Sequence, residues 1–444
     1  MPDAQEYHRA LITRHPFWTE LSPTAIKQRI EQMLAASDSE ALVQALSPVE
    51  YALLLKEAGD ARPLLLALAH PNQIRTVLDL DCWVKDTLRS TQVLDWLEEL
   101  YRSGDDVLLR ALQALDLELL LATFRQHIRV HAALPHEEEE EPIAFDEVLA
   151  NELYRVEFVD QNDLANDRIR RLLQLLQLMD LDFYHTLMQG VMWGQDIEIE
   201  EWAYRWKSGR LQDEGFPDYY AALETYSLIN LEQPLPTIAA SPSAPGLPES
   251  AEESGVIPSY AWSLIPAESL LAKALAHEFP LEVQERLCGE MVYLCNRELV
   301  IDQIDFADAT AVHASLSRVH AYLNLGIEHL HSQTSRSAAL LLTLHSLRSF
   351  YQIGFTLCMR LHQRALRLQA SLNQEAGIRR ALSGLARQVV DGLLDKPPRF
   401  FLGLIQPEST GYRDFCYIRD ITLVGPILTA LETDPAYRLL QRSA

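Results

Sequence analysis

Apolar side chains recur every three or four residues through most of this chain, which is the spacing of one face of an α-helix. Residues 93–115, VLDWLEELYRSGDDVLLRALQAL, show this spacing on both sides of Gly104, where a turn is expected. Residues 168–179 and 338–369 repeat it. Glycine supplies 17 of 444 residues, about half of its usual share of roughly 7%, which disfavours Gly-rich nucleotide-binding folds. We therefore predict an all-α protein, with RDFCYIRDITLV at 413–424 as the best strand candidate.

Two segments have the composition of linkers. Residues 135–142, PHEEEEEP, are an acidic run between prolines, and residues 232–259 hold six prolines among small and acidic residues. Neither offers an apolar face to bury, and the second is expected to be a disordered linker. The segments divide the chain into a helical-repeat domain, a middle helical segment with an aromatic turn, and a C-terminal helical bundle, at residues 1–134, 143–231 and 260–444.

Six short stretches share the pattern of a helix start, in which a capping residue is followed by Pro or Leu and, three positions later, by an apolar residue. They are LSPTAI, LSPVEY, AHPNQI, LDLDCW, LDLELL and MDLDFY, beginning at residues 21, 46, 69, 78, 115 and 179. Ser47 and Glu50 predict a capping box. In LDLDCW, Asp79 and Asp81 fit either this start or an Asp-x-Asp metal pair, and the repetition of the pattern favours the helix start.

Repeated helix corners predict a superhelix of short helix pairs over residues 1–130. Through its corner pattern this stretch resembles the helical repeats in the cytoplasmic domains of magnesium transporters and in flagellar motor switch proteins. The resemblance implies a helical-repeat fold. It does not imply magnesium transport, because the membrane part of the transporters has no counterpart here.

A second resemblance rests on LDLDCW and on three longer stretches, at residues 200–229, 321–330 and 348–361. They are EEWAYRWKSGRLQDEGFPDYYAALETYSLI, AYLNLGIEHL and RSFYQIGFTLCMRL. These stretches resemble an uncharacterised bacterial family known only as a domain of unknown function, over most of the chain apart from the proline-rich segment. The resemblance implies a helical protein along its full length and supplies no activity.

The stretch around residues 202–226 is the most distinctive candidate surface. It combines aromatic side chains with basic ones, a mixture that can bind a peptide or stack a base. The candidates for partner binding are Trp202, Trp206, Arg210, Asp218, Tyr219 and Tyr220. The alternative is an aromatic cluster that seals a turn between two helices, and this simpler interpretation is the favoured one.

The histidines suggest a metal site in the C-terminal bundle. Glu328 and His331 have the i, i+3 spacing of di-iron bundles, which need a second such pair that this chain lacks. His313 and His320 lie seven residues apart, as do Cys288 and Cys295, so four such side chains could meet in a bundle and hold zinc. Spacing of seven is also that of a buried helix stripe, which is the favoured interpretation. No motif for nucleophilic catalysis or nucleotide binding is present.

Charge is unevenly distributed along the chain. Residues 1–258 hold 20 Lys and Arg against 45 Asp and Glu, whereas residues 259–444 hold 18 of each, so the net charge of −25 falls on the first part. An acidic surface disfavours nucleic acid and suits a basic protein partner. A basic strip could contact an anion, but a solvated helix face is the favoured interpretation; its residues are Arg360, Arg364, Arg367, Arg379 and Arg380.

These features lead to an expected function. The five cysteines include no CxxC pair, and no signal peptide or membrane span is recognisable, which predicts a cytoplasmic protein. We predict a non-enzymatic interaction or regulatory scaffold with no cofactor. The alternative is an enzyme or metal-binding protein with a site at His313, His320, Glu328 and His331.

Overall fold

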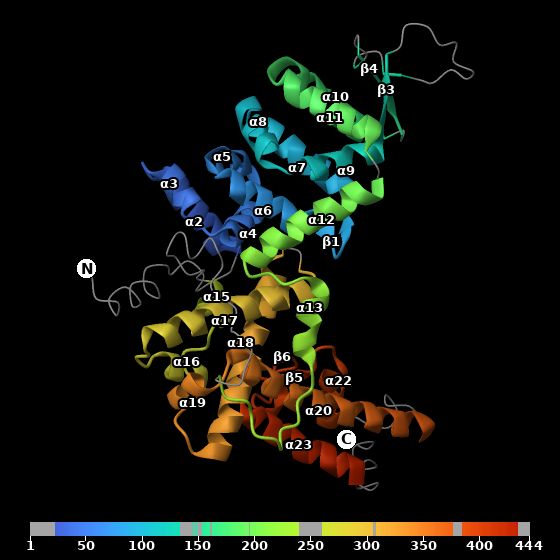
Figure 1. Ribbon diagram of the computed structural model, residues 1–444. Helices are drawn as coiled ribbons and strands as arrows, with labels where there is room; N and C mark the ends of the chain where they lie inside the picture. Colours follow the sequence, from blue (N-terminus) through green and yellow to red (C-terminus); the bar gives the residue numbers. More distant parts are fainter. Residues whose placement is uncertain are drawn as a thin grey trace.

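In a computed structural model the described residues form two helical bodies with three short antiparallel strand pairs, which confirms the all-α prediction (Figure 1). Helices from the first half of the chain gather in one body and those from residue 260 onward in the other. The structure describes residues 23–133, 145–146, 149, 153–159, 162–194, 196–238, 260–304, 308–375 and 384–433. The acidic run 135–142 and residues 239–259 of the proline-rich segment lie outside these ranges.

The N-terminal body begins with eight helices that stack in two layers. Each helix contacts the second helix after it, so that α2, α4, α6 and α8 form one layer and α3, α5, α7 and α9 form the other. This alternation is the superhelix of short helix pairs that the corners predict. The helices are α2 (Pro23–Ala35), α3 (Ser39–Gln44), α4 (Pro48–Glu57), α5 (Arg62–Leu68), α6 (Pro71–Asp81), α7 (Ser90–Ser103), α8 (Asp105–Ala114) and α9 (Leu117–His127).

Several predicted helix starts are present with the capping contacts that the sequence indicates. At α4, the Ser47 hydroxyl accepts from the backbone N–H of Glu50 (3.3 Å), whose carboxylate accepts from the backbone N–H of Ser47 (3.2 Å). Asp180 accepts a backbone N–H bond at the start of α11. His70, which the sequence ranks as a poorer cap, forms a capping box with Gln73 at α6. At these three starts local caps satisfy free N–H groups, whereas Asp116, at the start of α9, makes no side-chain cap bond.

The prediction of a helix start at LDLDCW is wrong. Helix α6, which begins at Pro71, continues through Asp79 and Asp81 and ends at Cys82. The chain then enters a hairpin in which β1 (Trp83–Val84) pairs with β2 (Thr87–Leu88). Both aspartates thus lie in the last turn of α6, where the helix dipole disfavours negative charge. Two aspartates can nevertheless occur at this helix end, because contacts with side chains distant in the sequence stabilise both carboxylates.

The middle segment packs on the N-terminal helices. Strands β3 (Ile128–Ala132) and β4 (Tyr154–Phe158) pair antiparallel, with Ile128 opposite Phe158. Helix α10 then contacts α7 and α9, α11 contacts α9, and α12 contacts α9 and α6. The described residues from 23 to the end of α12 therefore belong to the N-terminal body. These helices are α10 (Asp163–Met179), α11 (Leu181–Trp193) and α12 (Asp196–Asp213).

The C-terminal body is a bundle around two long helices, α18 and α20. Its strands β5 and β6 pair antiparallel, and β6 is the small part of the strand candidate 413–424 that is extended. The rest of that candidate lies mainly in α23, so the strand prediction is wrong for most of its length. The elements are α15 (Tyr260–Ser263), α16 (Leu270–Leu275), α17 (Leu281–Ile301), α18 (Ala309–Thr334), α19 (Ala338–Leu344), α20 (Leu347–Glu375), α22 (Gly384–Leu394), β5 (Arg399–Phe401), β6 (Tyr412–Asp414) and α23 (Ile418–Thr433).

Helices α18 and α20 touch backbone to backbone through two glycines. A Cβ atom at Gly326 would lie 2.0 Å from the carbonyl oxygen of Phe350, and one at Gly354 would lie 2.1 Å from that of Tyr322. The contact is reciprocal, because each glycine on one helix faces the residue four positions before the other glycine. Only a residue without Cβ allows this approach.

The segment after α12 crosses to the C-terminal body. Helix α13 (Tyr219–Leu223) contacts α17, where the buried Arg297 donates from Nε to the carbonyl of Ala222 (2.8 Å). The next ring, Tyr226, stacks on Phe355 with 4.7 Å between centroids. Further along, Pro236 accepts a hydrogen bond from His345 (3.0 Å), so residues 232–238 of the predicted linker lie against this body.

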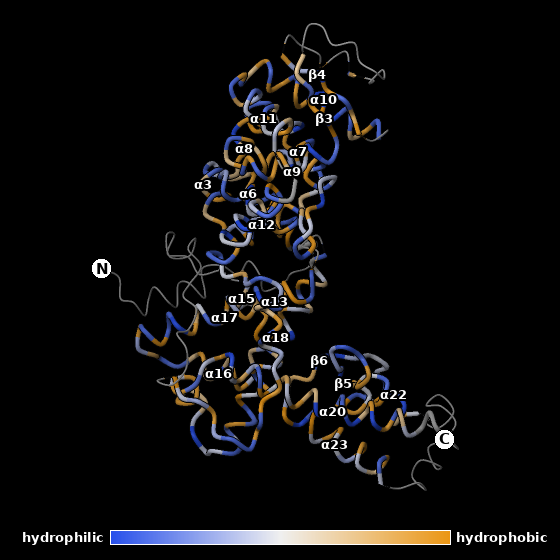
Figure 2. The backbone as a smooth tube through the Cα atoms, turned by 45° about the vertical axis from the view of Figure 1, so that its right-hand side comes forward, coloured by the Kyte–Doolittle hydropathy of each residue, from blue (hydrophilic) through white to orange (hydrophobic). Residues whose placement is uncertain are grey.

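Apolar residues are distributed through both bodies rather than concentrated in one segment (Figure 2). Among the described residues, none of the helices combines the length and the apolar character needed to cross a membrane.

Candidate functional site

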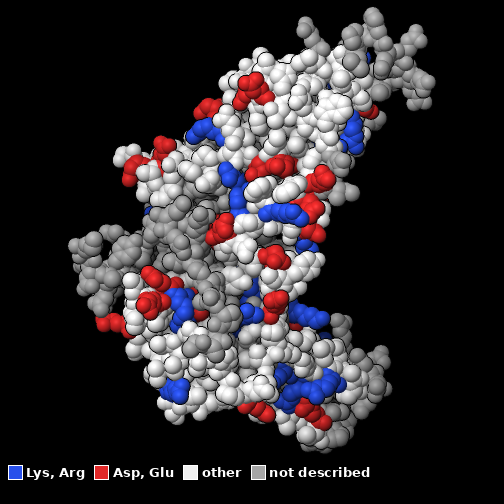
Figure 3. All heavy atoms as spheres, in the orientation of Figure 1, with Lys and Arg blue, Asp and Glu red and all other residues white. Residues whose placement is uncertain are grey.

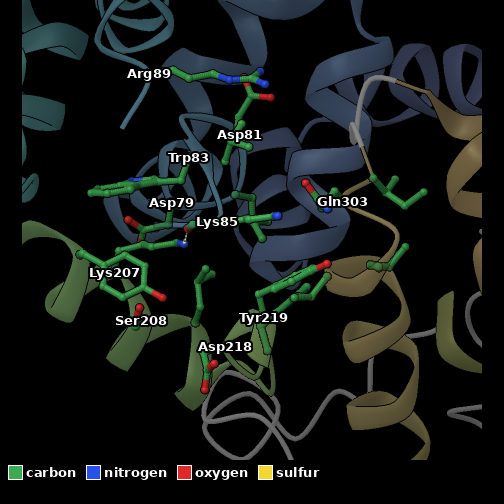
Figure 4. Close-up of a pocket in the computed structure, with 18 of the residues that line it drawn as sticks. Asp79, Asp81, Trp83, Lys85, Arg89, Lys207, Ser208, Asp218, Tyr219 and Gln303 are labelled. Atoms are coloured by element: carbon green, nitrogen blue, oxygen red, sulfur yellow. Dashed lines mark hydrogen bonds between the residues drawn. The ribbon is translucent and has the colours of Figure 1, made fainter. Parts of the chain in front are cut away.

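A cavity of about 490 Å³ lies where the two bodies meet (Figure 4). One side is formed by the end of α6 and the β1–β2 hairpin, and a second by α12 with the turn that leads to α13. The end of α17, from Leu299 to Ile304, closes the third side. Ligand pockets for small molecules typically measure roughly 300–1,000 Å³, so this cavity has the size of a binding site.

A buried ion cluster fixes the α12 wall of the cavity to the superhelix. Arg210 on α12 donates from Nε and Nη2 to the two oxygens of Asp79 (2.8 and 3.0 Å) and from Nη1 to Asp116 (2.6 Å). Asp79 is only 2% exposed. Burial raises the pKa of Asp79, and the hydrogen bonds and charge of Arg210 work against that rise. One guanidinium thereby joins α12 to the end of α6 and the start of α9.

The second aspartate of LDLDCW has partners of its own. Asp81 accepts from Lys56 Nζ (2.5 Å), from Trp96 Nε1 (2.7 Å) and from Gln92 Nε2 (3.1 Å). Each carboxylate of the Asp-x-Asp pair is thus held by a different cation. Within the described residues, no group of three or more His, Cys, Asp or Glu side chains is arranged to hold a metal ion.

Lys207 is the unusual cation on the cavity wall. Its ammonium lies 5.4 Å from the ring centroid of Trp83 and 5.1 Å from that of Tyr204, and donates to the carbonyl of Lys85 (3.3 Å). In the part of the chain that the structure describes, no carboxylate lies within ion-pair distance of it. Burial lowers the pKa of Lys207 to about 8, although the charge of Asp79 opposes the shift.

Two residues of the cavity wall have a left-handed backbone, which non-glycine residues rarely adopt. Lys85 at the tip of the hairpin has φ of 58°, and Gln303 at the end of α17 has φ of 50°. Ser335 is the third such residue in the described ranges. The Lys85 ammonium lies 4.9 Å from the centroid of the Tyr219 ring (Figure 4). Residues with a left-handed backbone conformation, one from each body, therefore line the same cavity.

The six residues predicted to bind a partner fall into two groups. Arg210 has the structural role described above, and Asp218 caps α13 by accepting from the backbone N–H groups of Tyr220 and Ala221. Tyr219 lines the cavity. The other three side chains are exposed, by 49%, 50% and 67%: Trp202, Trp206 and Tyr220.

The two exposed tryptophans form a stacked pair on α12. The rings of Trp202 and Trp206 are 6.4 Å apart, with an interplanar angle of 30°. The guanidinium of Arg205 lies 5.3 Å from the Trp202 centroid and pairs with Glu201 (2.5 Å). Glu198 precedes Trp202 by one helical turn and is also exposed. We call Glu198, Glu201, Trp202 and Trp206 the tryptophan surface.

The four candidate metal ligands of the C-terminal bundle are not brought together in one cluster of the described residues. His320 is buried and bonded to the carbonyl of Ala261 (2.8 Å), and burial lowers its pKa to about 4. His313 is exposed, and Glu328 accepts from the backbone N–H of Ile418 (2.7 Å). His331 contacts the carbonyl of Arg336, and Cys288 and Cys295 are buried free thiols.

The sequence profile of the family described as "Family of unknown function (DUF6178)" matches residues 6–436. The chain belongs to this family. The match confirms the resemblance to an uncharacterised family over nearly the whole chain, and it supplies no activity. No curated protein and no solved structure matches the chain, so the likeness to magnesium-transporter and flagellar-switch repeats stays an interpretation of the corner pattern.

Proposed function

We propose that this protein is a non-enzymatic interaction scaffold of the cytoplasm, whose tryptophan surface binds an arginine- or lysine-rich segment of a partner protein. The single observation that supports the proposal is that a guanidinium of this chain, that of Arg205, already binds at the tryptophan surface. Arg205 lies over the Trp202 ring and pairs with Glu201 at its edge. The neighbouring ring of Trp206, which is half exposed, offers a partner's basic side chain a second aromatic face of the same kind.

The charge of the chain supports a basic partner. Residues 1–258 carry a net charge of −25, and α12 lies within that part. On the face seen in Figure 3, Lys and Arg gather most densely over one corner of the C-terminal body. A basic segment would be steered toward the acidic body, and the aromatic contacts would then limit its dissociation.

A peptide-binding measurement tests this proposal. A fluorescein-labelled arginine-rich peptide, with a Glu-substituted version as control, is titrated with the full-length protein in 150 mM salt. Trp206→Ala should weaken binding at least about tenfold, since aromatic anchors contribute about 2 kcal/mol or more. Trp193→Ala is the matched control, because Trp193 is 77% exposed on α11 outside the tryptophan surface. Equal affinity of both variants and wild type would refute the proposal.

The alternative function is a metal-binding protein or enzyme with its site at His313, His320, Glu328 and His331. Among the described residues, no group of three or more His, Cys, Asp or Glu side chains is arranged to hold a metal ion, so no observed cluster supports this alternative. Elemental analysis of the purified protein tests it directly, since a stoichiometric metal that is lost in the His320→Ala variant would reverse the ranking.

A further inference from the structure

We propose that the cavity between the two bodies binds a small organic anion with an aromatic body, held by Lys207 and Lys85. This inference does not depend on the tryptophan surface, which lies outside the cavity. It rests on charge, on ring placement, on backbone conformation and on the position of the cavity (Figure 4).

The charges of the cavity wall leave its lysines available. Asp79 shares Arg210 with Asp116, Asp81 pairs with Lys56, and Asp218 accepts the N–H groups of α13, while Arg89 adds a further cation to the lining. Lys207 and Lys85 face the same space, and neither has an ion-pair partner among the residues that the structure describes. Asp86 acts on Lys207 only at a distance. The unpaired charge of the cavity wall is therefore positive. Because no carboxylate of the described residues pairs with either lysine, a bound anion could do so.

Aromatic rings stand beside both ammonium groups. Lys207 lies against Trp83 and Tyr204, and Lys85 lies against Tyr219. The Nε1 of Trp83 is buried and has no hydrogen-bond partner within the described ranges, so it remains as a donor. A flat ligand could lie along these rings while its anionic group contacts the lysines, which specifies an aromatic acid rather than an inorganic ion.

The backbone conformation of two wall residues also supports a ligand site in this cavity. Of three non-glycine residues with left-handed φ in the described chain, Lys85 and Gln303 line this cavity from opposite bodies. Such conformations are unfavourable for residues other than glycine and cluster at ligand sites. The tip of the β1–β2 hairpin and the end of α17 therefore both have unfavourable backbone conformations. A ligand in the cavity would contact both bodies at these two positions.

Naphthalene-2-sulfonate is a suitable probe, because it is a flat ring with one permanent charge, and naphthalene-2-sulfonamide is its uncharged counterpart at pH 7. Calorimetric titration of the full-length protein should show one site that binds the sulfonate at least about tenfold tighter, as expected for a hydrogen bond to a charged group. Lys207→Met should lose at least about tenfold in affinity, while Lys207→Arg should retain binding. Lys27→Met, on the exposed side of α2, makes the same chemical change elsewhere and should have no effect.

The pH dependence provides a test without any variant. The sulfonate keeps its charge between pH 7 and 9, whereas Lys207, with a pKa of about 8, loses its proton over that range. Affinity should therefore fall as pH rises from 7 to 9, and the total fall should not exceed the loss measured for Lys207→Met. Absence of a saturable site, a sulfonate affinity equal to that of the sulfonamide, or a flat pH profile would overturn the proposal. If Lys207→Met does not fold, as judged by circular dichroism, the wild-type pH profile decides.

Discussion

Replacing Arg210 by Met should destabilise the N-terminal body far more than a surface salt bridge would. The change leaves Asp79, which is 2% exposed, without its bidentate partner, and leaves Asp116 with one contact fewer. Removing one member of a buried pair costs about 3 to 5 kcal/mol, because the remaining charge stays buried and uncompensated. A Met side chain keeps most of the aliphatic packing, so the loss reports on charge.

The same helix supplies a matched control. Arg205 also pairs with a carboxylate, Glu201, but the two side chains are 59% and 57% exposed. Arg205→Met should therefore cost only about 0.3 to 0.5 kcal/mol. The variant Arg210→Met with Asp79→Asn should recover much of the loss, since no charge is then left buried at that position.

The loss should also depend on pH in a defined direction. Burial already raises the pKa of Asp79 with Arg210 present, and removal of the guanidinium raises it further. A carboxyl whose folded pKa lies above its unfolded value favours the fold below that folded pKa and loses this contribution as pH rises through it. The deficit of Arg210→Met relative to wild type should thus shrink as pH is lowered from 7 to 5.

Native-state hydrogen exchange on peptides of α6 and α12 in increasing urea is the appropriate assay, because it reports on the N-terminal body separately from the rest of the protein. The reasoning is refuted if Arg210→Met costs no more than Arg205→Met, or if the difference between wild type and Arg210→Met does not change with pH.

Three further outcomes follow from the described contacts. Asp180→Ala should cost about 1 kcal/mol through loss of the α11 cap, whereas Asp182→Ala, in the first turn without a cap role, should cost a few tenths by thermal melting. Gly326→Ala should cost about 1 to 3 kcal/mol by overpacking, while Gly209→Ala, whose added methyl meets nothing within 4 Å, should stabilise α12 slightly. Burial lowers the pKa of Lys207 from 10.5 to about 8, so the unfolded chain holds that proton to higher pH. Wild type should gain at most about 3 kcal/mol of unfolding free energy relative to Lys207→Met as pH rises from 8 to 10.5; an unchanged difference in melting temperature would contradict this.

The sequence predicts those parts of the fold that depend on neighbouring residues. The capping box of Ser47 and Glu50 and the cap at Asp180 involve contacts over three positions, so their pattern is visible in the chain. The cluster at Asp79 is different, because its partner Arg210 lies 131 residues away and a charge pattern at a helix end can resemble one at a helix start.

The candidate cavity was equally hidden from the sequence. Lys207 was recognisable only as a basic residue among aromatics, and its environment comes from the β1–β2 hairpin and the end of α17. Lys85 and Gln303 give no signal in the chain, because their left-handed backbone is imposed by the surrounding fold. Trp202 and Trp206, in contrast, are half exposed, which differs from the favoured interpretation of this stretch as an aromatic cluster that seals a turn.

The crossing of the chain between α12 and α13 has a consequence for how the protein could be divided. Residues 219–238, which end inside the proline-rich segment, bind to the C-terminal body through Ala222, Tyr226 and Pro236. A protease cut within 239–259 would therefore leave the first fragment with a tail seated in the second. The two fragments should elute together after cleavage and reassemble when mixed, as in a split protein. The same tail gives two copies of the chain a route to exchange segments, because each C-terminal body would accept the tail of either copy.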